Sequence, residues 1–201
     1  MNKLKAKVRL YLPLIKSLQT ALLLTTGLAG YMTARCPVTT TGTMLGLTLS
    51  LFLSVSGSTI LNMWYDRDID AKMPRTQKRP LPSGKMDATE ALRLGLIVSI
   101  LGVGIAVAVD ALYGLIIFGG LFIDVVIYTI WLKRKTAWSI VWGGVSGGMP
   151  ILAGRALGMG TIDWIGIALM LAVLFWIPTH ILTFSIRYRK DYKLAGVPTF
   201  P

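Results

Sequence analysis

Asn62, Asp66 and Asp70 carry oxygen-bearing side chains and recur at intervals of four residues in the stretch LNMWYDRDIDAK. At 3.6 residues per turn of an α-helix, successive members of this series are rotated by only about 40° and rise by about 6 Å, so they share one face. Asp68 points to roughly the opposite side. One amide and two carboxylates in a column suit Mg²⁺, which usually completes its shell with phosphate oxygens. The pattern therefore implies a phosphate-bearing ligand.

Basic residues follow this column and suit the same ligand. Arginine clamps phosphate oxygens through two parallel N–H groups, and lysine acts as a point charge. The simpler interpretation of each single cation is a contact with anionic lipid headgroups, but that gives no reason for the aspartates, which repel one another unless a cation neutralises them. The cations expected near the aspartates are Arg75, Lys78, Arg79, Lys85, Lys133 and Arg134.

The chain that carries this column has the composition of an integral membrane protein. Of its 201 residues, 54% are hydrophobic and only 15% are charged. Six apolar stretches are long enough to cross a bilayer core of about 30 Å as helices, so we expect an all-α transmembrane bundle in a single domain over residues 1–201. The predicted spans are Leu12–Ala34, Thr43–Tyr65, Ala91–Val109, Ala111–Leu132, Ala137–Leu157 and Ile162–Ile186.

The placement of the basic residues accounts for the formal net charge of +12 without a nucleic-acid partner. A cytoplasmic amino terminus and six crossings put nearly all lysines and arginines on the cytoplasmic side, as the positive-inside rule requires for a multi-pass protein of the cell membrane. Only Arg35 and Arg155 remain outside. The aspartate column then opens to the cytoplasm. The single cysteine, Cys36, excludes an internal disulfide and most metal frameworks.

The segment NMWYDRDIDAKMPRTQKRPL resembles the first aspartate-rich motif, N-x-x-x-D-x-x-x-D, of the UbiA-type intramembrane prenyltransferases. Two further segments, YTIWLKRKTAWSIVWGGVSGGMPILAGRA and WIPTHILTFSIRYRKDYKLAGVPTFP, resemble the heme O synthase (protoheme IX farnesyltransferase) branch of that family. The resemblance covers about residues 10 to 201. It implies transmembrane helices around a central cavity, in which Mg²⁺ bridges a prenyl diphosphate to the aspartates.

The chain also departs from the family pattern. The family usually has nine membrane helices, whereas six are predicted here, so we expect a truncated product or a fragment. The second family motif is D-x-x-x-D, but Asp191 is followed four positions later by Ala195, so this segment supplies at most one carboxylate. Near the start, where the heme O branch often has a Lys-Pro-Arg-like sequence, this chain has Lys16, Ser17 and Leu18.

The resemblance implies Mg²⁺-dependent transfer of a farnesyl-type group from its diphosphate to a hydrophobic acceptor, with heme B as the first choice. Stabilising the pyrophosphate leaving group lowers the barrier most, with Mg²⁺ as Lewis acid and template. The residues expected to hold Mg²⁺ and act in catalysis are Asn62, Asp66, Asp70 and Asp191; those expected to bind the substrates are Arg79, Lys133, Arg134, Tyr128 and His180.

Aromatic side chains near the column can stabilise the carbocation by cation–π attraction while the helices exclude water. The candidates are Trp64, Tyr65, Tyr128 and Tyr188. The simpler interpretation of each of them is an aromatic belt at the membrane interface.

Two residues inside the predicted spans have open roles. His180, the only histidine, follows Pro178 and either satisfies the turn that the proline distorts or contacts a porphyrin acceptor, because the heme O branch has a similar Pro-x-His stretch. Asp124 lies where a carboxylate is costly and usually faces the bundle interior. It is a protonated packing residue, a neighbour of the catalytic groups or a partner to another polar group.

Other functions fit the same residues. A UbiA-type enzyme can use a quinone precursor or an archaeal glycerol lipid as its acceptor. Intramembrane carboxylates also mark ion pathways, so a cation or phosphate transporter is a second class. Transporters place such groups near the bilayer midplane in inverted repeats, whereas here the acids cluster at one mouth beside a basic loop. A non-catalytic assembly partner is a third class.

Overall fold

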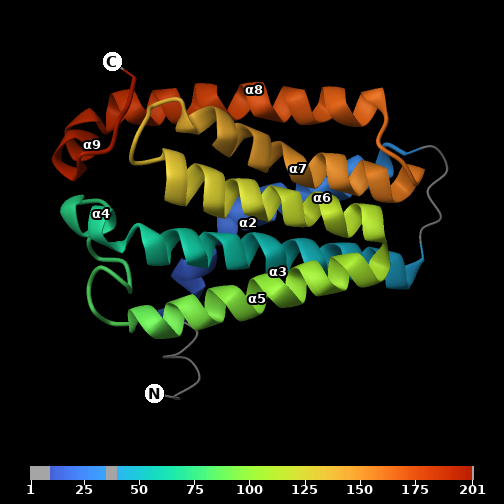
Figure 1. Ribbon diagram of the computed structural model, residues 1–201, viewed down its shortest axis with the longest axis horizontal. Helices are drawn as coiled ribbons and strands as arrows, with labels where there is room; N and C mark the ends of the chain where they lie inside the picture. Colours follow the sequence, from blue (N-terminus) through green and yellow to red (C-terminus); the bar gives the residue numbers. More distant parts are fainter. Residues whose placement is uncertain (1–9, 35–39, 201) are drawn as a thin grey trace.

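The computed structural model describes residues 10–34 and 40–200, and over these residues the regular elements are all helices. This confirms the predicted all-α fold class. The long helices run side by side along the length of the molecule (Figure 1). They are α2 (Ser17–Met32), α3 (Thr41–Tyr65), α5 (Ala88–Val109), α6 (Ala111–Phe122), α7 (Ser139–Met159) and α8 (Trp164–Arg187). The π-helix η2 (Ile123–Leu132) continues α6, and the short helices are η1 (Leu12–Ile15), α4 (Arg67–Lys72) and α9 (Arg189–Ala195).

Four helical segments of the described chain are both long and apolar enough to cross a membrane: α3, α5, α6 with η2, and α8. They correspond to four of the six predicted spans. The other two predicted spans are helices as well, but α2 has only 16 residues and α7 contains Pro150 and several glycines. The chain is therefore a multi-pass membrane protein.

The first predicted span differs from the structure at its start. Instead of one helix from Leu12, the chain forms the short 3₁₀-helix η1, and Lys16 then adopts a left-handed backbone with φ 42° and ψ 61°. Pro13 lies at the start of η1 and fixes its own φ, while the left-handed residue breaks the helical path. As a result α2 begins only at Ser17.

Glycines allow two pairs of helices to approach closely. At the crossing of α2 and α7, a Cβ on Gly154 would lie 1.9 Å from the carbonyl oxygen of Gly27. Where α3 meets α5, a Cβ on Gly102 would lie 2.5 Å from the backbone nitrogen of Ser54. Small residues at such crossings allow dispersion contacts between backbones, which stabilise helix pairs in lipid.

The two ends of the bundle differ in chemistry. At one end lie α4, α9 and the loop that leads to α5 (Figure 1), and α4 packs on α9 through Ile69, Met73 and Ala195. At the other end, Arg155 of α7 is only 3% exposed and donates hydrogen bonds to both carboxylate oxygens of Asp163, at 2.7 and 2.6 Å. The first end, which we call the charged end, holds the aspartate column.

Candidate functional site

Asn62, Asp66 and Asp70 lie one turn apart on the last turns of α3 and on α4. Although the helix bends at Asp66, the N–H of Asp66 donates to the carbonyl of Asn62 at 2.9 Å, and the N–H of Asp70 donates to that of Asp66 at 2.8 Å. These bonds continue the four-residue periodicity across the junction, so the three side chains face one cavity at the charged end. All three residues are buried. The predicted column is therefore present.

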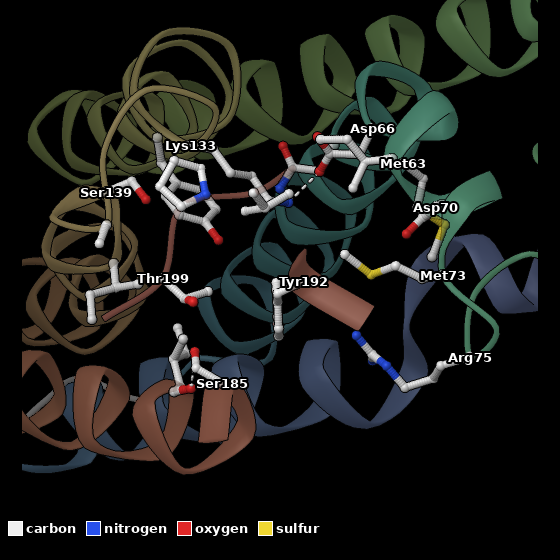
Figure 2. Close-up of a pocket in the computed structure, with 18 of the residues that line it drawn as sticks. Met63, Asp66, Asp70, Met73, Arg75, Lys133, Ser139, Ser185, Tyr192 and Thr199 are labelled. Atoms are coloured by element: carbon white, nitrogen blue, oxygen red, sulfur yellow. Dashed lines mark hydrogen bonds and ion pairs between the residues drawn. The ribbon is translucent and has the colours of Figure 1, made fainter. Parts of the chain in front are cut away.

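This cavity, which we call the head cavity, has a volume of about 200 Å³. Figure 2 shows Asp66, Asp70, Arg75, Lys133 and Tyr192 among the side chains that line it. Arg79 and Lys16 complete its charged lining. Two carboxylates and four cations thus surround one small space, an arrangement that suits a multiply charged anion bound together with a metal ion.

Each aspartate of the column has a basic partner. Lys133 forms an ion pair with Asp66, and Arg79 donates to Asp70 at 2.7 Å. Burial works against the charge of Lys133, but the neighbouring Tyr128 and Asp66 outweigh it, so the pKa of this lysine lies above its ordinary value. The ammonium also lies 5.5 Å from the ring centroid of Tyr128. Lys133 therefore contributes a positive charge to the lining of the cavity.

The donor set fits Mg²⁺. Oδ1 of Asp66 is buried and has no hydrogen-bond partner among the described residues, so this oxygen is left for a ligand. No group of three or more acidic, histidine or cysteine side chains converges in the described part of the chain. Mg²⁺ needs no such group, because one or two carboxylates with substrate phosphates usually hold it. The residues that would hold it are Asn62, Asp66 and Asp70.

Arg134 and Asp191, both predicted for the site, do not line the head cavity. Arg134 makes a two-pronged ion pair with Asp68, at 2.7 and 2.8 Å, and its guanidinium lies 4.5 Å from the ring centroid of Tyr65. Asp191 of α9 is half-buried, and its neighbour Tyr192 lines the cavity in its place. The structure thus brings Asn62, Asp66, Asp70, Arg79, Lys133 and Tyr128 together, but not Arg134 or Asp191.

A second, mainly apolar cavity of about 500 Å³ adjoins the head cavity. We call it the tail cavity; it lies among α2, α3, α6, η2, α7 and α8. The two cavities share lining residues, namely Lys16, Asn62, Arg75, Tyr128, Lys133, Ile181 and Tyr192. The two cavities therefore adjoin, one of them charged and the other mainly apolar. This agrees with the central cavity expected from the sequence.

His180 lines the tail cavity. Its ring is stacked on Trp176, with centroids 5.3 Å apart and an angle of 5° between the planes, and Phe184 meets it edge-on at 5.0 Å. Of the aromatic residues expected to stabilise a cation, Tyr128 lines both cavities. Trp64, Tyr65 and Tyr188 instead contact arginines, and neither cavity includes them in its lining.

Asp124, whose role the sequence left open, is a partner of Asn62. Its Oδ2 accepts hydrogen bonds from Nδ2 of Asn62 at 2.8 Å and from the hydroxyl of Ser58. Its Oδ1 accepts from the hydroxyl of Ser146 at 3.4 Å. The carboxylate therefore faces the bundle interior, where it lines the tail cavity.

Lys16 is the functional candidate that the sequence analysis missed. It lines both cavities, and it is the only non-glycine residue with positive φ in the described chain. Burial, followed by repulsion from Lys133 and Arg79, lowers the pKa of Lys16 to about 8. A strained backbone at a ligand cavity is typical of functional sites. The sequence identifies this lysine only as the first residue of a segment that differs from the Lys-Pro-Arg-like sequence of the heme O branch.

The profile of the UbiA prenyltransferase family matches residues 23–201. A protein from Archaeoglobus fulgidus named protoheme IX farnesyltransferase is 43% identical over 202 residues, which cover 100% of this chain and 69% of that protein. A protein of the same name from Korarchaeum cryptofilum is 42% identical and is covered to 66%. The chain thus spans about two thirds of the length of these relatives.

Among solved structures, a UbiA homolog from Archaeoglobus fulgidus bound to DMAPP and Mg²⁺ superimposes with a TM-score of 0.81 at 21% sequence identity. The match covers 94% of this chain and 68% of that one. A structure described as digeranylgeranylglyceryl phosphate synthase gives the same TM-score at 22% identity. At these identities the likeness establishes the fold alone.

Proposed function

This chain belongs to the UbiA prenyltransferase family, and from this premise we propose that it transfers a farnesyl group from farnesyl diphosphate to protoheme IX (heme B) in an Mg²⁺-dependent reaction. The observation that carries the proposal is that the charged head cavity adjoins the mainly apolar tail cavity and shares seven lining residues with it. A prenyl diphosphate has the same division, since a multiply charged head is joined to a hydrocarbon tail. A transporter of a free ion would not need an apolar cavity next to the charged one.

The residues of the head cavity have separate tasks in this reaction. Asn62, Asp66 and Asp70 would hold Mg²⁺, which when bound supplies Lewis-acid stabilisation of the diphosphate. Lys133 and Arg79 pair with Asp66 and Asp70 in the ligand-free protein, and their cationic groups would bind diphosphate oxygens in the same cavity. The positive charge then stabilises the leaving group as the bond to the prenyl carbon breaks.

The tail cavity provides the hydrophobic part of the reaction. Its lining is mainly apolar, so it excludes water from the prenyl carbocation. Tyr128 lines both cavities and stands where the charged head meets the tail, a position from which its ring can stabilise the cation. His180 lies in the same chamber, and we propose that it contacts the acceptor.

The acceptor and the donor length follow from the relatives at about 40% identity, which are named protoheme IX farnesyltransferase. We propose the substrates that this name states for the present chain as well. The orientation is also proposed: the basic loops at the charged end face the cytoplasm by the positive-inside rule, so the head cavity opens to the cytoplasm of a cell membrane. Asp191 and Arg134 would act only if α9 and the end of η2 shift on ligand binding.

To test the proposal, labelled farnesyl diphosphate and heme B are added to membranes that contain the chain. The heme and lipid extracts are then examined by mass spectrometry. We expect a farnesylated heme that requires Mg²⁺. Asp66→Ala and Asp70→Ala should abolish the product while leaving membrane insertion intact. Asp68→Ala is the matched control, because this carboxylate is solvent-exposed and pairs with Arg134 outside the cavities.

The outcomes separate the parts of the proposal. A labelled lipid or quinone precursor in place of heme would correct the acceptor and keep the site. Equal loss in all three aspartate variants would count against the head cavity, because Asp68 does not line it. Product formation that survives both Asp66→Ala and Asp70→Ala would refute the metal site.

A further inference from the structure

The helix η2 is a π-helix of ten residues, and its winding sets which side chains face α3. The N–H of Lys133 donates to the carbonyl of Tyr128, five residues earlier, at 2.8 Å. Residues five apart, such as Asp124 and Thr129, therefore lie about one turn apart on the same face. In an α-helix that relation belongs to residues three or four apart. π-Helical winding is rare, and the single-turn π-bulges that occur inside α-helices are frequent at functional sites.

The side-chain amide of Asn62 lies between these two residues. Its Nδ2 donates to Oδ2 of Asp124 at 2.8 Å, and its Oδ1 accepts from the hydroxyl of Thr129 at 2.9 Å. Thr129 is 0% exposed and Asn62 is 8% exposed. Both halves of the amide thus have a partner from η2.

The carboxylate of Asp124 determines the orientation of the side-chain amide of Asn62. Its other partners, the hydroxyls of Ser58 and Ser146, both donate to it. A carboxylate that only accepts must meet the NH₂ side of Asn62, so the amide oxygen has to face away from it. That oxygen has two lone pairs and Thr129 uses one. The second remains for a ligand of the head cavity, which Asn62 lines.

We propose that Asp124 and Thr129 are positioning residues that hold the amide of Asn62 in the orientation needed to bind the metal–diphosphate head group. The inference rests on the proposed function. It assigns the intramembrane carboxylate a task in the site, although Asp124 itself lines only the tail cavity. Residues that orient a metal ligand without touching the metal commonly govern its affinity.

The test measures calorimetric binding of inorganic pyrophosphate with Mg²⁺ to the purified full chain in detergent. Asp124→Asn keeps the shape but offers Asn62 both a donor and an acceptor, so the amide loses its fixed orientation. Thr129→Val removes the hydroxyl at the other end. We expect each variant to weaken Mg²⁺-dependent pyrophosphate binding by about 10- to 100-fold, the usual effect of losing such a partner.

Asp110→Asn is the matched control, since it makes the same chemical change at the N-cap of α6, the helix that η2 continues. Asp110 caps α6 by accepting from the N–H of Tyr113 at 2.7 Å, and asparagine caps a helix about as well. Its pyrophosphate affinity should equal that of the wild type. The thermal midpoint of every variant is measured alongside, because a purely structural role would lower the midpoint without changing the affinity of the folded protein.

The decisive comparison adds Asn62→Ala to each variant. If Asp124 and Thr129 act through Asn62, neither substitution weakens binding further once the amide is gone. Wild-type affinity in Asp124→Asn and Thr129→Val, or full additivity with Asn62→Ala, would overturn the inference and leave the proposed function standing. Wild-type protein that fails to bind pyrophosphate with Mg²⁺ would overturn both.

Discussion

Lys133 and Asp66 form an ion pair across 67 positions of the chain, joining the end of η2 to the junction of α3 and α4. The next residue, Arg134, pairs with Asp68 on the opposite side of the helix. The two adjacent cations thus pair with two aspartates that lie in different environments. Asp66 is buried at the cavity, whereas the side chain of Asp68 is 56% exposed. The pairing explains how a buried carboxylate column is tolerated without metal.

Lys133→Met should destabilise the ligand-free protein. The substitution leaves Asp66 buried and unpaired, which costs about 3 kcal/mol, at the low end of the usual range because the lysine side chain is 24% exposed. Chemical or thermal unfolding in detergent measures the loss. Saturating Mg²⁺ should restore part of it, since the metal replaces the missing positive charge.

The double variant Lys133→Met with Asp66→Asn is the control for that prediction. It removes both charges, so it should be more stable than Lys133→Met alone. If the two substitutions destabilise additively, the ion pair does not matter for stability and the interpretation of the pairing is wrong.

Two substitutions of Lys16 separate the effect of its charge from the effect of its left-handed backbone conformation. Lys16→Met removes the ammonium and keeps the left-handed strain, whereas Lys16→Gly removes both. We expect the two variants to bind Mg²⁺–pyrophosphate equally weakly, while Lys16→Gly is more stable than Lys16→Met by about 1 kcal/mol because glycine adopts positive φ without strain. Calorimetry and unfolding curves measure the two effects. Wild-type affinity in Lys16→Met would exclude this lysine from the site.

The sequence predicted the column and its family correctly because both depend on local pattern. Four-residue spacing keeps Asn62, Asp66 and Asp70 on one helical face. Hydropathy predicts helices at all six apolar stretches, and four of these helices are long and apolar enough to cross a membrane. The fold class and the prenyltransferase family are confirmed by the helical bundle and by the family match over residues 23–201.

The parts that the sequence missed depend on backbone winding. The π-helical turn that brings Asp124 and Thr129 to Asn62 has no signature in residue types, and an α-helical register would separate them. The left-handed turn at Lys16 is equally hidden, because lysine is not the residue expected there. Lys133 and Arg134 both follow the predicted fourth span, but their side chains point in different directions, so that Lys133 pairs with Asp66 of the column and Arg134 with Asp68 outside it.

Bulk added to the tail cavity should reduce the contribution of the prenyl tail to binding. Val55 lines this cavity, and Val55→Phe should displace roughly two methylene groups of the tail, a loss of about 1.6 kcal/mol or about 15-fold in farnesyl diphosphate affinity. Pyrophosphate affinity should not change. Leu49→Phe, at an exposed position on the same helix, is the control. Equal loss of pyrophosphate binding would show that the substitution disturbs the head cavity instead.

The ion pair of Arg155 and Asp163 should make stability depend on pH at acid values. The Arg155 guanidinium, helped by the N–H of Gly166, lowers the pKa of Asp163 to about 2, from 3.8 in the absence of these partners. A lowered pKa in the folded state means that the stabilisation is complete above pH 3.8 and is lost as the pH falls toward 2. Asp163→Asn cannot titrate, so the difference in stability between wild type and variant should shrink across that window. Unfolding curves in detergent between pH 2 and 6 measure it, and a constant difference would mean that the buried arginine does not depend on this carboxylate.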